Sequence, residues 1–172
     1  MRHVPVTTHD VPRLAHEWVV DDASPGRLHR VIDGTMVFAD VSGFTKMSER
    51  VSRLGKVGAE TISEIIDTCF TRLIDDAAAF GGTLVQFGGD AVLVCFRGDG
   101  HERRGVAAAC EMRRSLRSLR EFTANVGHVP LSMTIGVETG AFDVFLVGRS
   151  HRQLIVGGSR ASSLATLEQR AV

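Results

Sequence analysis

Two aspartates, Asp40 and Asp90, stand beside glycine-containing turns and are the residues best suited to bind a divalent cation. Asp40 follows the apolar run Thr35–Ala39, where an ionised carboxylate is costly unless its charge is compensated. Asp90 closes the turn Gly88-Gly89-Asp90. If Thr35–Ala39 and Thr83–Phe87 are neighbouring strands, both carboxylates reach one edge of the sheet, where they would repel each other without a cation. Singly, Asp40 could cap the following helix and Gly-Gly-Asp is ordinary hairpin chemistry; together they favour a metal site.

The residues that follow Asp40 suit an anion. The turn Val41-Ser42-Gly43-Phe44-Thr45 leads into an expected helix. Gly43 allows the backbone to approach a ligand closely, and the first N–H groups of a helix point at anions. Because Mg²⁺ prefers one or two carboxylates together with phosphate oxygens, the sequence predicts a site for a metal-bound nucleoside triphosphate.

Other common functional patterns are absent from the sequence. Gly55-Lys56 lacks the following Ser or Thr and the upstream glycine of a P-loop. No Gly-x-Ser-x-Gly elbow is present, and the seven histidines show no metal-ligand spacing. Acidic and basic residues number 20 each, so no net field favours nucleic acid or an anionic membrane as partner. No apolar run approaches the roughly 20 residues of a membrane span, and the chain does not begin like a signal peptide.

Hydrophobic periodicity predicts the elements that would position these residues. Thr35–Ala39 suits a buried strand, and helical spacing predicts a helix from about Phe44 to Gly55. Longer helices are expected at Ile62–Ala77 and Glu102–Phe122, and a last one from about Ser159. Further strands are expected at Thr83–Phe87, Ala91–Phe96, Leu131–Val137, Phe142–Val147 and Gln153–Val156. This order predicts an α+β fold, a mostly antiparallel sheet with helices packed on one face.

The predicted helix Glu102–Phe122 carries several arginines, interleaved with glutamates, which favours a solvated face over a nucleic-acid patch. Its expected inward residues are Val106, Ala109, Cys110, Leu116 and Leu119. Cys110, Cys69 and Cys95 lie in apolar segments and are expected to be reduced core thiols, which suits a cytoplasmic protein. Residues 1–33 are expected to be a peripheral segment and 34–172 a single domain.

The run Phe38-Ala39-Asp40-Val41-Ser42-Gly43-Phe44-Thr45, followed by Phe87-Gly88-Gly89-Asp90-Ala91-Val92-Leu93, resembles the class III adenylyl/guanylyl cyclase catalytic domain. The resemblance extends from about Gly34 to the C-terminus and implies a ferredoxin-like cyclase homology domain. It is strongest to the first of two tandem domains in large actinobacterial signalling proteins. The final strands of that family have no counterpart here, so the chain is expected to be truncated or a fragment.

The resemblance implies a head-to-tail dimer with a second cyclase domain and active sites at the interface. Asp40 and Asp90, with the carbonyl of Val41, would hold Mg²⁺ or Mn²⁺. Ser42, Gly43, Phe44 and Thr45 would hold the β- and γ-phosphates of ATP, or of GTP. The products would be a cyclic nucleotide and pyrophosphate.

Several other family positions are altered in this chain. The purine-selecting lysine corresponds to Gln86, and its partner, usually Asp or Thr, to Ile155. The Asn and Arg that orient the ribose and stabilise the transition state correspond to Ser162 and Thr166, with Arg160 a displaced candidate for the arginine. Ala141 stands where some members have a phosphate-binding arginine.

These substitutions lead to three hypotheses. The first is the metal- and nucleotide-binding half of a nucleotidyl cyclase, most simply an adenylyl cyclase, with weak or no activity alone. The second is a catalytically degenerate regulatory or dimerisation module. The third is a diguanylate-cyclase-like domain, suggested by Gly88-Gly89-Asp90 but disfavoured because Ala91-Val92 replace the Glu-Phe expected next.

Overall fold

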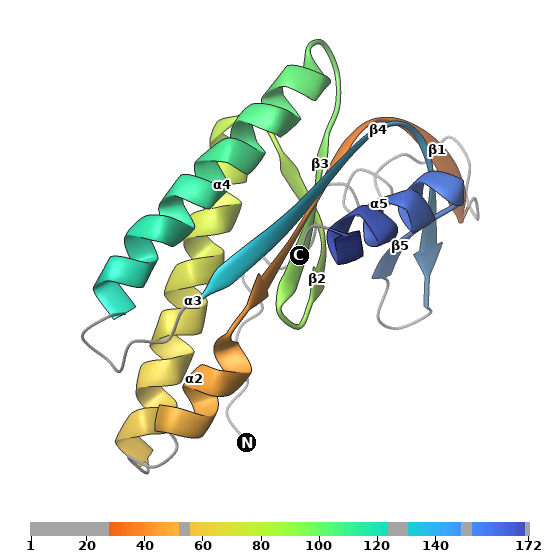
Figure 1. Ribbon diagram of the computed structural model, residues 1–172. Helices are drawn as coiled ribbons and strands as arrows, with labels where there is room; N and C mark the ends of the chain where they lie inside the picture. Colours follow the sequence, from red (N-terminus) through yellow and green to blue (C-terminus); the bar gives the residue numbers. More distant parts are fainter. Residues whose placement is uncertain (1–27, 52–55, 124–130, 149–152, 171–172) are drawn as a thin grey trace, which may run out of the picture.

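The computed structural model describes residues 28–51, 56–123, 131–148 and 153–170. Five strands and four helices lie in these ranges (Figure 1). In chain order they are β1 (His29–Ser42), α2 (Phe44–Val51), α3 (Lys56–Ala79), β2 (Thr83–Gly88), β3 (Ala91–Phe96), α4 (His101–Thr123), β4 (Ser132–Val147), β5 (Gln153–Gly157) and α5 (Ser159–Arg170). Leu54 and Gly55, the expected end of the first helix, lie outside the described residues.

The strands form one sheet in the order β2-β3-β1-β4-β5, and every neighbouring pair is antiparallel. β1 lies in the centre and pairs with β4 along its whole length, from His29 to Ser42. The expected α+β fold with an antiparallel sheet is therefore confirmed. None of the described helices is long and apolar enough to cross a membrane.

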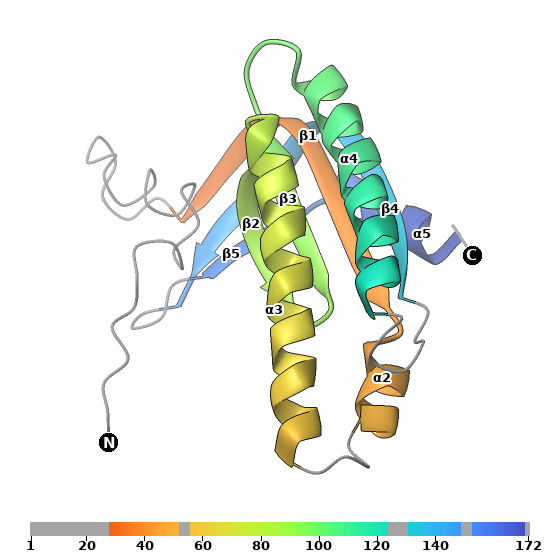
Figure 2. The same cartoon turned by 90° about the vertical axis from the view of Figure 1, so that its left-hand side faces the viewer.

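Alternation along β1 creates a core on each face of the sheet. Val37, Ala39 and Val41 are fully buried in the cluster to which α3 and α4 contribute. Met36 belongs to the cluster on the opposite face, which includes Leu164 of α5. Figures 1 and 2 show α3 and α4 together on one side and α5 on the other. The expectation of helices on one face was therefore wrong for α5, because its mostly polar sequence gave little indication of the face it covers.

Two glycines explain why β1 and β4 are longer than expected. Gly34 and Gly140 lie directly opposite each other in the β1–β4 ladder. A Cβ on Gly34 would lie 2.5 Å from the carbonyl oxygen of Phe96, so this glycine permits close packing and does not form a turn. The sheet consequently includes residues 29–33, which were expected to be peripheral, and the two strands expected at 131–137 and 142–147 are the single strand β4.

The buried face of α4 differs by part of a turn from the expected one. Its fully buried residues include Ala108 and Met112, whereas Val106 is 52% exposed and Cys110 is exposed. The cause lies in Gly105, where a Cβ would approach Thr35 Cγ2 to 2.7 Å, so α4 packs closely through its small residues. Ala109 and Leu116 are buried as expected. The predicted burial of Val106 and Cys110 was wrong.

Candidate metal- and nucleotide-binding site

β1 lies between β3 and β4, so the supposition that β1 pairs with the strand at 83–87 was wrong. The β2–β3 hairpin nevertheless brings Asp90 to β1. The N–H of Val41 donates a hydrogen bond to the carbonyl oxygen of Asp90 at 2.9 Å, and Asp40 is the register partner of Ala91. The backbones that carry the two aspartates are therefore joined at the edge of the sheet formed by the C-terminal end of β1 and the β2–β3 turn.

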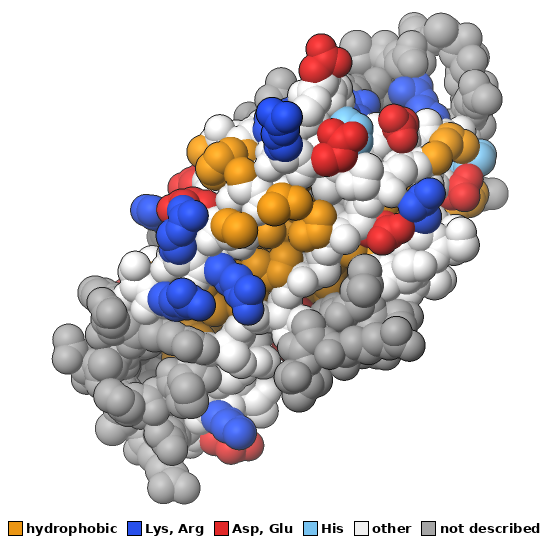
Figure 3. Space-filling model, turned by 45° about the horizontal axis from the view of Figure 1, so that its top comes forward, with side chains coloured by type: hydrophobic (Ala, Val, Ile, Leu, Met, Phe, Trp, Pro, Cys, Tyr) orange, Lys and Arg blue, Asp and Glu red, His pale blue; other side chains and the backbone are white. Residues whose placement is uncertain are grey.

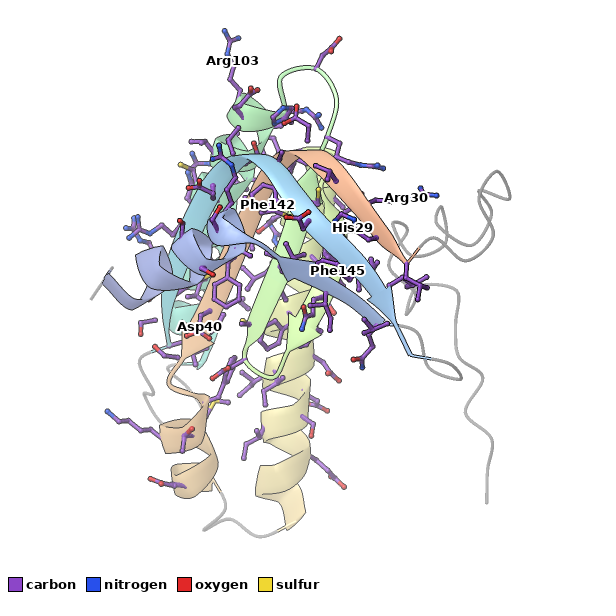
Figure 4. All side chains as sticks on the ribbon, turned by 90° about the vertical axis from the view of Figure 1, so that its right-hand side faces the viewer. His29, Arg30, Asp40, Arg103, Phe142 and Phe145 are labelled. Atoms are coloured by element: carbon purple, nitrogen blue, oxygen red, sulfur yellow. The ribbon has the colours of Figure 1, made fainter. Side chains whose placement is uncertain are left out.

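Asp40 lies on the face of the sheet opposite α3 and α4. The alternation of β1 places it with Met36 and Phe38, while the fully buried Val41 faces the other way. Figure 4 shows Asp40 near the end of β1 that leads into α2. Asp40 is partly buried and Asp90 is exposed, so the edge is open on the hairpin side.

The available donors fit a cation that also takes phosphate oxygens. Within the described ranges, no group of three or more His, Cys, Asp or Glu side chains could hold a metal. Asp40 and Asp90 would supply two carboxylates, and the carbonyl of Val41 lies on the same side of the strand as its N–H, which points at the hairpin. Two carboxylates with ligand phosphates and water suit Mg²⁺, whereas an all-protein cage needs more ligands.

The turn between β1 and α2 is built around Gly43. Its φ of +110° lies in a region that favours glycine. Its carbonyl accepts the N–H of Met47 at 3.0 Å, the first bond of α2, so the N–H groups of residues 44–46 face outward from the helix start. Phe44 anchors this start through its ring, 5.8 Å from that of Phe70. The geometry suits an anion beside Asp40.

Sequence reasoning missed two hydroxyl residues at this edge. The hydroxyls of Ser42 and Ser132 hydrogen-bond at 2.5 Å, and Thr134 is the β4 partner of Asp40. Both missed residues belong to β4, some 90 positions away from β1 in sequence. Only the β1–β4 register reveals them, and no local motif marks it.

The two positions that the resemblance assigns to base selection lie on the two edge strands. Gln86 is exposed and follows a register shift in β2; it pairs with Leu93, which pairs in turn with Phe38 of β1. Ile155 of β5 is 45% exposed. The sheet curls so that its edges approach one another, because β2 and β5 are in contact and Val85 and Leu154 share a core cluster (Figure 4).

The residues of α5 do not reproduce the ribose- and phosphate-orienting pair. Ser162 is exposed, and its hydroxyl donates to the Gly158 carbonyl at 3.4 Å. The side chain of Thr166 lies outside the described residues. Arg160 donates to Glu138 Oε1 at 2.9 Å and to the Thr139 carbonyl at 2.8 Å.

Arg160 is therefore held by β4. A Cβ on Gly140 would lie 2.6 Å from its guanidinium carbon, so the guanidinium also packs against this glycine. Ala141, the next residue of β4, is exposed and offers no cation.

Comparison with known proteins identifies the family. The model of the adenylate and guanylate cyclase catalytic domain matches residues 28–172, and the chain belongs to this family. Adenylate cyclase type 10 of Mus musculus is 26% identical over an alignment of 145 residues, and the alignment covers 81% of this chain. The chain spans only 9% of the length of that relative.

Solved cyclase structures share the fold. The adenylyl cyclase CyaB from P. aeruginosa superposes with a TM-score of 0.72 at 25% identity, covering 84% of this chain and 74% of that chain. The guanylyl cyclase Cya2 superposes with a TM-score of 0.68 at 27% identity, covering 84% and 72%. Both agree with the fold expected from the two aspartate motifs.

Proposed function

We propose that this domain is the metal- and nucleotide-binding half of a class III nucleotidyl cyclase, and that it converts ATP to cyclic AMP and pyrophosphate together with a complementary domain. The observation that carries the proposal is the hydrogen bond from the Val41 N–H to the Asp90 carbonyl at 2.9 Å. It holds the two aspartate-bearing segments at one edge of the sheet, directly before the Gly43 turn. Similarity to an adenylate cyclase over 81% of the chain supports the substrate class.

Each residue of the site has a distinct role in this proposal. Asp40, Asp90 and the carbonyl of Val41 hold Mg²⁺ or Mn²⁺. The N–H groups at the start of α2, with Ser42 and Thr45, bind the β- and γ-phosphates and fix the position of the α-phosphate. The bound ions would supply charge stabilisation to the attacking ribose 3′-oxygen and to the departing pyrophosphate.

The chain offers little to complete a site by itself. Gln86 is neutral, Ile155 has no polar group, and the guanidinium of Arg160 binds β4. Losing one transition-state donor costs about 10²–10³ in rate, and this site lacks several. A complementary cyclase domain, joined head to tail, would bring the missing Lys, Asn and Arg.

A complementation assay tests this function. The purified chain is mixed with a cyclase domain that carries Lys, Asn and Arg but has Asn at its own metal positions. We expect cyclic nucleotide formation at least about 100-fold above that of either protein alone. Introducing Asp40→Asn should remove that product, and parallel reactions with ATP and GTP identify the base.

A regulatory or dimerisation module with the cyclase fold is the second candidate. The engagement of Arg160 by Glu138 and the apolar side chain at Ile155 favour it. The module hypothesis predicts no product in the complementation assay and no heat of ATP binding with Mg²⁺ or Mn²⁺. Metal-dependent ATP binding would contradict it.

A further inference from the structure

The outer surface of the α3–α4 pair takes no part in the proposed chemistry. The two helices lie side by side and antiparallel over the sheet (Figure 2). Arg72 Nε donates to Ser115 Oγ at 3.2 Å, and Arg104 Nη1 donates to the Phe80 carbonyl at 3.1 Å. These contacts fix which residues of α3 and α4 lie at the same height along the pair.

Charge is divided between the two helices. Among the α3 side chains that the structure describes, the exposed charged ones are mainly acidic, namely Glu60, Glu64, Asp67 and Asp75, with Arg72 as the exception. The exposed residues of α4 include Arg103, Arg113, Arg114 and Arg117. Figure 3 shows most of its Lys and Arg side chains on the left, the side on which Figure 1 places both α4 and α3.

The exposed apolar residues gather at the end of the pair where α3 finishes and α4 begins. Val106, 52% exposed, and Cys110 lie in the first half of α4. Ala78 and Ala79 are exposed at the end of α3, which lies beside the first half of α4 because Phe80 contacts Arg104. Each helix therefore has a few exposed small or apolar residues near one end, although Glu102 and Arg103 are exposed at that end of α4 as well.

A second copy complements this pattern in one orientation. A two-fold axis parallel to the helices places α3 of each copy over α4 of the other at equal height. Within about one helical turn, Asp75 then faces Arg113, Asp67 faces Arg117, and Ala78 faces Val106. A two-fold axis across the helices would place acidic α3 on acidic α3, which like charges disfavour.

The groove between the helices would lie on this axis, and its charges are already paired within one copy. Arg72 Nε is 3.1 Å from Asp76 Oδ1, and Arg114 pairs with Glu111. A hollow of about 430 Å³ lies there, lined by residues that include Thr68, Ser118 and Leu119. Neither pair would therefore place an uncompensated charge against the same charge of the second copy at the axis.

The size of the face and the net charge of the chain permit association. Helices of 24 and 23 residues are roughly 35 Å long and together about 20 Å wide. Such a face would bury about 700 Å² per copy, close to the ~800 Å² of a standard interface. The chain has no net charge, so two copies do not repel one another globally.

We propose that the outer face of α3 and α4 is a self-association surface that binds a second copy of this chain with two-fold symmetry. The surface lies on the face of the sheet opposite Asp40. It is thus separate from the site proposed for nucleotides and leaves that site free for a complementary domain.

Charge-reversal variants, each made in the full chain, test the proposal by sedimentation velocity at low salt. Wild-type chain should dimerise, and raising salt from about 50 mM to about 500 mM should weaken the dimer. Asp67→Arg or Arg117→Asp alone should weaken association at least about ten-fold. The double variant should restore it, because the attractive pair is rebuilt with its signs exchanged. A monomeric wild type, or single reversals without effect, would overturn the proposal.

Disulfide cross-linking gives an independent readout. Ala78→Cys places a thiol on α3 near the height of the natural Cys110 of α4. Oxidation should yield a covalent dimer that Ala78→Cys/Cys110→Ser does not form. Thermal melting checks that each variant is folded, and a folded Ala78→Cys chain without the covalent dimer would also overturn the proposal.

Discussion

Among single residues, Gly43 is the one whose backbone conformation would position the proposed phosphate site. It lies between Ser42, the last residue of β1, and Phe44, the first of α2, with φ +110°. A residue with a side chain is strained in this conformation by about 1–3 kcal/mol. Because the turn must direct the N–H groups of α2 toward the edge that carries Asp40, this strain would displace the proposed phosphate donors.

The first prediction concerns Gly43→Ala. We expect nucleotide affinity in the presence of Mn²⁺ to fall about ten-fold, which corresponds to about 1.4 kcal/mol. Gly98→Ala is the matched control, because Gly98 also has a positive φ, +78°, but lies in open space away from the site. Calorimetric titration of both variants measures the difference, and equal affinities would contradict the assigned role of the turn.

Residue types alone indicated part of this site. Asp40 and Asp90 could be singled out because carboxylates beside apolar runs and glycine turns need a compensating charge. The engagement of Arg160 by Glu138 could not be predicted, because it depends on how α5 docks against β4. The proximity of Ser132 to Ser42 required the β1–β4 register.

At the scale of elements, close backbone approach determines where strands continue. Gly34 lies within β1, and a Cβ there would meet the Phe96 carbonyl oxygen at 2.5 Å, a backbone atom that cannot turn away. Gly88, at the end of β2, has space, since the nearest atom to its Cβ position is 4.0 Å away. The two glycines therefore differ in the space that is available for a Cβ atom.

The second prediction compares these two glycines. Gly34→Ala should lower the free energy of unfolding by about 1–3 kcal/mol through overpacking. Gly88→Ala should change it by less than about 0.5 kcal/mol. Urea unfolding followed by circular dichroism measures both, and equal losses would contradict the packing account.

The elements themselves were largely predictable, and their faces were less so. Ala91–Phe96 is a strand with the expected bounds, because its apolar run has only one plausible structure between a turn and a polar loop. The phase of α4 was wrong because alanines and glycine, rather than Val106 and Cys110, fit against the sheet. Small residues give a weak periodic pattern. The face of α4 that packs on the sheet is therefore determined by close packing, and the hydrophobic pattern did not indicate it.

At the scale of the whole molecule, one buried thiol links stability to pH. Burial raises the pKa of the Cys69 thiol from 9.0 to about 11, because α3 places it in the core. The folded state therefore favours the protonated thiol. The contribution of the protonated Cys69 thiol to the free energy of unfolding is fully present below pH 9 and is lost as the pH rises from 9 toward 11.

The third prediction follows from this sign. The free energy of unfolding should fall by on the order of 2 kcal/mol between pH 9 and pH 11. Cys69→Ala should reduce this fall, although the mutation lowers stability at neutral pH. The exposed Cys110 supplies the control, and Cys110→Ala should leave the alkaline loss unchanged. Denaturant melts across this range measure the effect, and an unaltered pH profile in Cys69→Ala would contradict it.

The proposed metal site and the proposed self-association surface lie on opposite faces of the domain. The proposed metal site lies where β1 meets the β2–β3 hairpin, on the face that carries α5. The charged α3–α4 surface lies on the other face. A complementary cyclase domain and a second copy of this chain could therefore bind at the same time.

The most direct test of the central claim is Mn²⁺ binding followed by electron paramagnetic resonance with a non-hydrolysable ATP analogue. The wild-type chain should bind Mn²⁺ together with the analogue. Asp40→Asn and Asp90→Asn should each weaken that binding at least about ten-fold, while Asp75→Asn on the distant α3 should leave it unchanged. Equal Mn²⁺ binding by the wild type and both site variants would contradict a shared metal site at Asp40 and Asp90.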